Sequence, residues 1–214
     1  MSVSDLAGRK ALVTGGAKGL GAGMAAALAD AGAAVVIGDV LEEEGRATAD
    51  SVGKSGAATG FVKLDVTDDG NWERAVAATV EQLGGFDLLV NNAGIEISSL
   101  VVDIDPADIR RMCDVNILGV ALGLKHGLRA MRPGGAAGAG GAIVNVSSVA
   151  ATIPFPGIAG VLRHQVGRRP ADQGRGSGGR QAGVRRPREL RVPRPGRHGD
   201  GTRAGCRHGE ARAV

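Results

Sequence analysis

The amino-acid sequence predicts an α/β fold, a doubly wound parallel sheet of about five strands. Short apolar runs alternate with longer stretches rich in Ala, Leu and Glu from about residue 9 to residue 148. The short runs are apolar throughout, as in strands that helices cover on both faces. The stretches between them are long enough for helices, which is the pattern of consecutive βαβ units.

Elements in the first half are predicted from β-branched runs and helix start signals. Strands are predicted at residues 11–14, 34–37 and 61–64, where strand-favouring residues cluster. Helices are predicted at residues 20–31, 41–51 and 71–83. Glycines open the first helix, and Asp68 and Asp69 supply a start signal for the third.

The second half continues the pattern with two strands and one long helix. Strands are predicted at residues 86–90 and 142–146, and a long helix at about 106–131. Pro106 suits the first turn of that helix. No regular pattern follows Gly160, so we predict an incomplete sheet and a domain that spans residues 1–160.

Charge divides the 214-residue chain near residue 160, although its net charge is only +4. Residues 1–160 carry 12 Lys and Arg against 18 Asp and Glu, whereas residues 161–214 carry 14 Arg, no Lys and 4 acids. The second segment also holds 11 Gly and 4 Pro but no aromatic residue, which predicts a disordered basic tail. An Arg-rich nucleic-acid-binding arm is the alternative. Without aromatic residues it lacks a stacking platform, so we expect no specific nucleic acid partner.

Two further signals exclude other classes of protein. There is no charged-then-apolar leader at Met1 and no apolar run of about 18 residues, which predicts a cytoplasmic protein without a membrane anchor. Cys113 and Cys206 lie far apart without metal-type spacing, so neither a disulfide framework nor a metal site is expected.

A glycine-rich segment lies directly between the first strand and the first helix. Residues 14–21 read Thr-Gly-Gly-Ala-Lys-Gly-Leu-Gly. Glycines there permit a tight turn and close approach of a pyrophosphate, to which the helix N-terminus offers free N–H groups. This arrangement predicts a Rossmann-type dinucleotide site. The residues of this segment assigned to the cofactor are Thr14, Gly15, Lys18, Gly19, Leu20 and Gly21.

Asp39 ends the second strand, 18 residues after Gly21. A carboxylate at about this distance accepts hydrogen bonds from the adenosine ribose and repels a 2′-phosphate. Lys18, beside the glycine turn, is a weaker signal in the opposite direction. Because Asp39 is the stronger of the two signals, the sequence predicts NAD as the cofactor.

The spacing Gly-x-x-x-Gly-x-Gly resembles the short-chain dehydrogenase/reductase family. The segment Asn91-Asn92-Ala93-Gly94 matches the family signature that closes the adenine pocket, and Asp65-Val66 is similar to its adenine-contacting pair. The likeness covers residues 5–160. It implies five further cofactor-binding residues, which are Asp65, Val66, Asn92, Ala93 and Gly94.

The same resemblance implies an activity. Asn116 matches the family's helix asparagine, which holds a water in the proton relay, and Ser148 of the pair Ser147-Ser148 matches the catalytic serine. The chain is similar to bacterial NAD-dependent hydroxysteroid dehydrogenases. This likeness implies hydride transfer between NAD(H) and a steroid-like secondary alcohol or ketone, in a homotetramer or dimer.

The family's catalytic Tyr-x-x-x-Lys pair is absent from its expected place. In the family the tyrosine is the general acid/base, and the lysine lowers its pKa and holds the nicotinamide ribose. The tyrosine is expected 13 residues after Ser148, where this chain has Val161, and the lysine position holds Gln165. The chain contains no tyrosine at all.

A change of reading frame near Gly160 accounts for this loss. The codons from Val161 onward, read one base later, admit Tyr-Ser-Ala-Thr-Lys at the expected position. Residues 187–196, shifted in the same way, admit Arg-Val-Asn-Cys-Val-Tyr-Pro-Gly-Leu, which matches the family's nicotinamide-contacting segment. Two matches in one frame and in the correct order predict an out-of-frame tail at 161–214.

The sequence as written predicts a member of this enzyme family with negligible turnover. Of the four catalytic positions it keeps Asn116 and Ser148. A non-catalytic dinucleotide-binding fragment is the alternative interpretation. Related enzymes associate through the long helix and the missing catalytic helix, so an impaired oligomer is expected.

Overall fold

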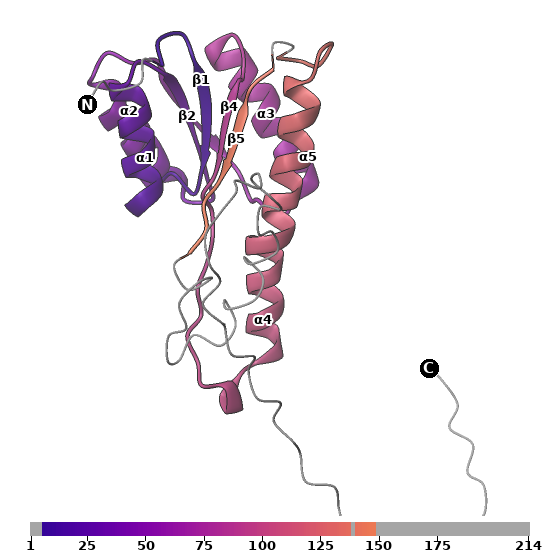
Figure 1. Ribbon diagram of the computed structural model, residues 1–214. Coiled ribbons are helices and arrows are strands. Elements are labelled where there is room, and N and C mark those ends of the chain that lie inside the picture. The colour runs from indigo at the N-terminus through magenta and orange to yellow at the C-terminus, as the bar shows by residue number, and fades with distance from the viewer. Residues whose placement is uncertain (1–5, 138–139, 149–214) are drawn as a thin grey trace, which may run out of the picture. The chain divides into compact units, whose positions relative to one another are not determined.

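The computed structural model describes residues 6–137 and 140–148, which contain a wholly parallel five-stranded sheet (Figure 1). The strand order is β3-β2-β1-β4-β5, so the chain moves outward from β1 to β3 and then returns to the other side of β1. The strands are β1 (Lys10–Thr14), β2 (Ala34–Asp39), β3 (Thr59–Lys63), β4 (Leu88–Asn91) and β5 (Ala142–Asn145). This order confirms the predicted doubly wound sheet of about five strands.

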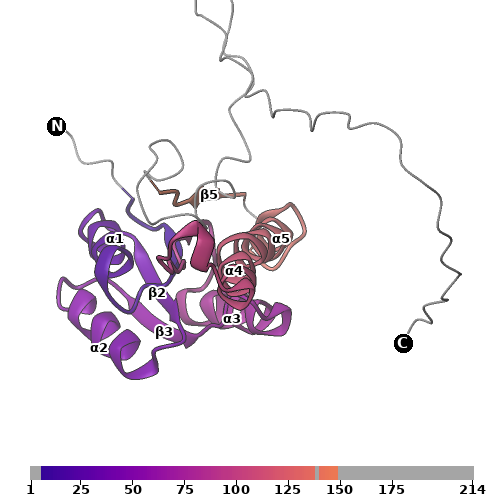
Figure 2. The ribbon, with the colours of Figure 1, turned by 90° about the horizontal axis from the view of Figure 1, so that it is seen from below.

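Helices cover both faces of the sheet. α1 and α2 contact one face, and α3 and α5 contact the other (Figure 2). The helices are α1 (Gly19–Asp30), α2 (Glu42–Gly53), α3 (Asp69–Leu83), α4 (Pro106–Cys113) and α5 (Gly119–Met131). Side chains of β1 alternate between the two layers, with Ala11 and Val13 in the α1–α2 core and Leu12 in the α3–α5 core. No helix in the described ranges is both long and apolar enough to cross a membrane.

Trp72 is the largest fully buried side chain in the described residues and joins α3 to α5. Its indole N–H donates to the carbonyl of Val66 at 3.0 Å, and its ring stacks on His126 with the ring planes 4° apart. His126 lies 2.8 Å from the Asp69 carboxylate, which also accepts a hydrogen bond from Lys125. The hydrogen bonds from Lys125 and His126 hold the pKa of Asp69 below its ordinary value. Asp69 therefore stays charged at neutral pH and links the two helices.

The helix predicted at 106–131 contains a π-helical turn in the structure. α4 ends at Cys113, a π-helical turn η2 (Asp114–Leu118) follows, and α5 begins at Gly119. A π-helical turn has i→i+5 hydrogen bonds, so it shifts the direction of the side chains that follow it. A β-carbon on Gly119 would lie 2.8 Å from the Val66 side chain, so the helix approaches the end of β3 closely here. The predicted extent of the helix is confirmed, whereas the π-helical turn within it was not predicted.

The α1 side of β5 is the least covered part of the described sheet. The backbone of β5 pairs with β4, but the side chain of Val144 on this face is 55% exposed. An apolar groove of about 290 Å³ runs along this side. It is lined by Met24, Ala27, Leu28, Val90, Val144 and Val146. Among the described residues no helix fills it.

We predict that Gly123→Ala destabilises the fold and that Gly23→Ala does not. A β-carbon on Gly123 in α5 would overlap Asn91 Oδ1 and lie 2.8 Å from the Trp72 ring, and overpacking of this kind costs about 1–3 kcal/mol. Gly23 in α1 is exposed and has nothing within 4 Å of an added β-carbon. Alanine there should stabilise the helix by about 0.5–1 kcal/mol. Urea unfolding measures both effects, and equal stability of the two variants would contradict the packing.

Candidate functional site at the carboxyl edge of the sheet

The glycine-rich segment predicted at 14–21 connects the end of β1 to the start of α1. Gly15 and Gly19 have φ angles of +64° and +62°, which side chains other than glycine rarely adopt. A β-carbon on Gly15 would lie 2.8 Å from the Cα of Ala93, and one on Gly21 would overlap the carbonyl oxygen of Gly15. The turn therefore requires glycine at 15 and 19, and close packing of neighbouring backbone requires it at 15 and 21.

Thr14 and Asn92 join this turn to the end of β4. The Thr14 hydroxyl accepts hydrogen bonds from the N–H groups of Asn92 and Ala93, both at 3.1 Å, and donates to the carbonyl of Val90. In return, the Asn92 side-chain amide donates to the carbonyls of Thr14 and Gly15 at 3.0 and 3.1 Å. Thr14 is buried beneath the turn. Its contacts are those of a residue that shapes the site from below rather than one that lines it.

Asp39 stands at the end of β2 and holds the glycine turn from the other side. Its carboxylate accepts hydrogen bonds from the N–H of Ala17 at 2.9 Å and from the N–H of Leu41 at 3.1 Å, one on each oxygen. The carboxylate is thereby fixed in position where β2 gives way to α2.

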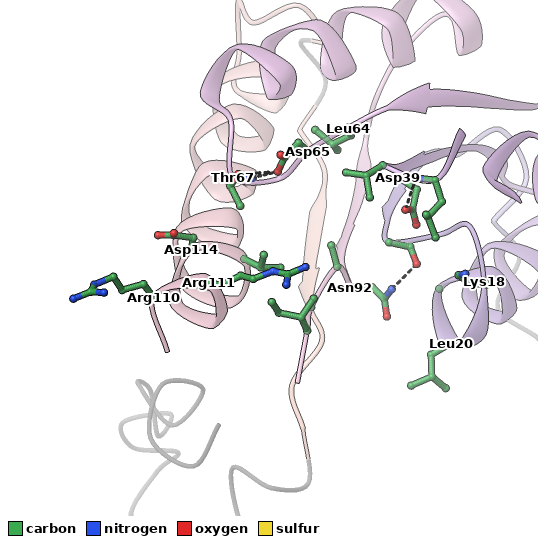
Figure 3. A pocket seen from close by; sticks show the side chains of 18 of the residues that line it. Lys18, Leu20, Asp39, Leu64, Asp65, Thr67, Asn92, Arg110, Arg111 and Asp114 are labelled. Atoms are coloured by element: carbon green, nitrogen blue, oxygen red, sulfur yellow. Dashed lines mark hydrogen bonds between the residues drawn. The ribbon is translucent and has the colours of Figure 1, made fainter. Parts of the chain in front are cut away.

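These segments surround an open cleft of about 1050 Å³ at the carboxyl ends of the strands (Figure 3). Nine of the predicted cofactor residues line it, namely Gly15, Lys18, Leu20, Gly21, Asp39, Asp65, Asn92, Ala93 and Gly94. Thr14, Gly19 and Val66 do not line it. The described residues thus bring most of the predicted site together, from four separate stretches of the chain.

Ten lining residues were not predicted. They are Val40, Leu41, Leu64, Thr67, Ile95, Ala107, Arg110, Arg111, Asp114 and Val115. Five of these lie on α4 or η2, where Ala107, Arg111 and Asp114 follow helical spacing. This spacing could have indicated from the sequence that the three residues share one face of a helix. In Figure 3 the Arg111 side chain extends from α4 toward Asn92, whereas Arg110 points away from it.

Asp65 and Val66 take different parts in the site. The Asp65 carboxylate accepts from both the N–H and the hydroxyl of Thr67, at 2.9 and 2.8 Å, and so closes the turn after β3. Val66 is buried beneath the cleft, and its carbonyl accepts the Trp72 hydrogen bond described above. Only Asp65 of the pair faces the cleft.

Asn116 lies in the π-helical turn η2, next to the loop that follows β4. Its side-chain oxygen accepts from the N–H of Ile95 at 2.9 Å, and its side-chain nitrogen donates to the carbonyl of Ile95 at 2.8 Å. The side chain therefore holds the loop after Gly94 in place. Short π-helical turns are frequent at functional sites.

The remaining predicted catalytic positions lie at or beyond the end of β5. Ser147 is exposed and Ser148 is half-buried, directly after β5 at the same edge of the sheet as the glycine turn. Neither serine lines the cleft among the described residues. Val161 and Gln165 lie outside the described residues, as does the predicted tail at 161–214.

The cleft suits a dinucleotide in size, shape and charge. Its volume lies at the upper end of the range of about 300–1,000 Å³ for small-molecule sites. The close packing at Gly15 and Gly21 brings the glycine turn directly against the start of the loop after β4. Lys18 and Arg111 offer positive charge for phosphates, and the fixed Asp39 carboxylate offers acceptors for ribose hydroxyls. The site lies where the strand order reverses, which is where parallel α/β proteins of the dinucleotide-binding class bind their ligands.

Comparison with known proteins identifies the family within this class. The short chain dehydrogenase family matches residues 9–160. The chain is 44% identical to trans-4-hydroxycyclohexanecarboxylate dehydrogenase of Sinomonas cyclohexanicum over 72% of its own length and 60% of that protein. It is 41% identical to 3-alpha-(or 20-beta)-hydroxysteroid dehydrogenase of Mycobacterium tuberculosis, over 67% of this chain and 53% of the relative.

A solved structure agrees with these sequence matches. A short-chain type dehydrogenase/reductase from Mycobacterium marinum superposes with a TM-score of 0.72 at 29% identity, over 78% of this chain and 68% of that structure. The chain therefore belongs to the short-chain dehydrogenase family of oxidoreductases, whose members generally bind NAD(P). It spans only about half to three fifths of the length of the two curated relatives.

We predict that Thr14→Val destabilises the protein more than Thr14→Ser does. Valine leaves the half-buried N–H of Ala93 without its acceptor and removes one of the two acceptors of the Asn92 N–H, and loss of an acceptor costs about 1–3 kcal/mol. Serine keeps the hydroxyl and removes one methyl group, which costs about 1 kcal/mol or less. Thermal and urea unfolding of both variants measure the difference. Equal loss in both would mean that the methyl group, rather than the hydrogen bonds, matters.

Proposed function

We propose that this chain binds NAD(H) in the cleft and descends from an enzyme that transfers hydride between NAD(H) and a secondary alcohol or ketone. The observation that carries the cofactor assignment is the Asp39 carboxylate at the end of β2, fixed by the N–H groups of Ala17 and Leu41. In such a reaction NAD accepts the hydride, and the protein holds NAD in position.

The hydrogen bonds of Asp39 support NAD in preference to NADP. Each carboxylate oxygen has two lone pairs, and the backbone uses one on each. The remaining lone pairs can accept hydrogen bonds from the two hydroxyl groups of an adenosine ribose. A 2′-phosphate would instead meet a negative charge that two backbone hydrogen bonds hold in place.

We propose an alicyclic secondary alcohol, or the matching ketone, as the substrate class of the parent enzyme. The names of the two relatives describe a hydroxycyclohexanecarboxylate and hydroxysteroids, which are both secondary alcohols of alicyclic compounds. In this proposal Ser148 holds the substrate oxygen, and Asn116 supports the proton relay. A steroid-like substrate is the narrower form of the proposal.

We propose further that the chain as written has negligible turnover. It contains no tyrosine, and the positions expected for the catalytic pair hold Val161 and Gln165. Loss of a positioned general acid/base lowers a rate by about 10²–10⁴-fold. The family match ends at residue 160, which supports a change of reading frame at this point and a domain limited to residues 1–160.

With negligible turnover, this chain would act as a non-catalytic NAD-binding protein. An Arg-rich nucleic-acid arm at 161–214 is less favoured, since the segment lacks aromatic residues for stacking.

Members of the family assemble through the long helix, and Leu118 and Leu128 are exposed along η2 and α5. We propose that the parent is a homotetramer or dimer and that association of this chain is impaired.

We expect the chain to bind NADH more tightly than NADPH, and Asp39→Asn to reduce that preference. Losing a charged acceptor should weaken NADH binding by about tenfold or more. Asp30→Asn, at the exposed end of α1, removes the same charge outside the cleft and is the control. Fluorescence titration with NADH and NADPH measures both affinities. Equal affinity of the unchanged chain for the two nucleotides would contradict the assignment to NAD.

Resequencing tests the proposed loss of activity. We expect an independent template across the codons for residues 155–200 to reveal a one-base change of frame near Gly160. The frame-corrected protein should oxidise alicyclic alcohols with NAD, and replacement of its restored tyrosine by phenylalanine should lower the rate by about 10²–10⁴-fold. The chain as written should show no rate above background. A measurable NAD-linked rate from it would contradict the proposal.

A further inference from the structure

Two side chains of α2 contact the glycine turn. Glu44 forms an ion pair with Lys18, with 3.7 Å between Oε1 and Nζ, and the Thr48 hydroxyl donates to the carbonyl of Ala17 at 2.6 Å. Glu44 and Thr48 are four residues apart and so lie on one face of the helix. Because Ala17 also donates its N–H to Asp39, the turn is held by α2 and by the end of β2 together.

Lys18 has a position that works against the selection of NAD. It lines the cleft on the same side as Asp39, which in the proposed function faces the adenosine ribose. A free ammonium group there would attract a 2′-phosphate on that ribose, whereas the Asp39 carboxylate repels it. The two charges therefore favour different cofactors, and their balance depends on what else lies beside them.

We propose that Glu44 is a specificity-determining residue for the cofactor. By pairing with Lys18 it draws the ammonium group toward α2 and offsets its charge, so Asp39 alone decides between a ribose 2′-hydroxyl and a 2′-phosphate. The proposal rests on the proposed function, because it requires a nicotinamide dinucleotide in the cleft. Glu44 does not itself line the cleft and would affect cofactor binding through its ion pair with Lys18.

The contacts of the turn support this role. Thr48 and Asp39 hold the two sides of the Ala17 backbone, which fixes where the Lys18 side chain begins and keeps it within reach of Glu44. Lys18 and Glu44 are 67% and 49% exposed, so solvent screens the pair and its effect should be modest. The expected change in affinity for a 2′-phosphate is therefore about three- to fivefold.

Glu44→Gln tests the proposal, with Glu43→Gln as the matched control. Both residues are exposed in the first turn of α2, and both changes remove one negative charge, but in the described structure only Glu44 pairs with Lys18. Fluorescence titration of the full chain with NADPH should show about three- to fivefold tighter binding for Glu44→Gln. Binding of NADH should stay within about twofold for both variants. Because the effect is electrostatic, the gain should shrink at high salt.

A double variant shows whether the effect passes through Lys18. In Lys18→Met/Glu44→Gln the gain for NADPH should disappear, and a gain that persists would overturn the proposal. Equal NADPH affinity of Glu44→Gln and Glu43→Gln, with normal NADH binding, would also overturn it and leave the proposed function intact. Failure of the unchanged chain to bind either nucleotide would instead remove the proposed function, and this inference with it.

Discussion

The hydrogen bonds between Thr14 and Asn92 connect two strand ends that are neighbours in the sheet but far apart in the chain. β1 leads outward to β2 on one side, and β4 returns on the other, so a crevice opens where these two ends meet. The buried Thr14 hydroxyl satisfies two N–H groups of the loop after β4 at once. The glycine turn, the loop at Asn92 and the cleft between them all depend on this joint.

Around that joint the cleft is organised by fixed charges. Asp39 and Asp65 both use backbone N–H groups as partners, which holds their carboxylates still at the ends of β2 and β3. Lys18 of the glycine turn and Arg111 of α4 bring positive charge to the two sides of the cleft.

In the proposed function, the cofactor-binding residues and the expected catalytic pair fall in different parts of the sequence. The residues that line the cleft lie between Gly15 and Val115, within the family match that ends at residue 160. The catalytic pair expected at positions 161 and 165 falls after that match. A change of frame at this point can therefore remove the chemistry while leaving the cleft-forming sequence unaltered. The apolar groove beside β5 marks where the described sheet lacks a covering helix.

The sequence by itself determined the alternation of strands and helices, the glycine turn and the position of Asp39, because these depend on local periodicity and on motifs within a few residues. The bounds of β3 and β4 differed by two residues from their predicted starts, since pairing with neighbouring strands decides where a strand begins. Only the tertiary structure revealed the π-helical turn at Asn116, which depends on packing against Val66 and Ile95. It also placed Arg111 in the cleft and Thr14 beneath it, because the side chain that faces a cavity is decided by how helices pack on the sheet.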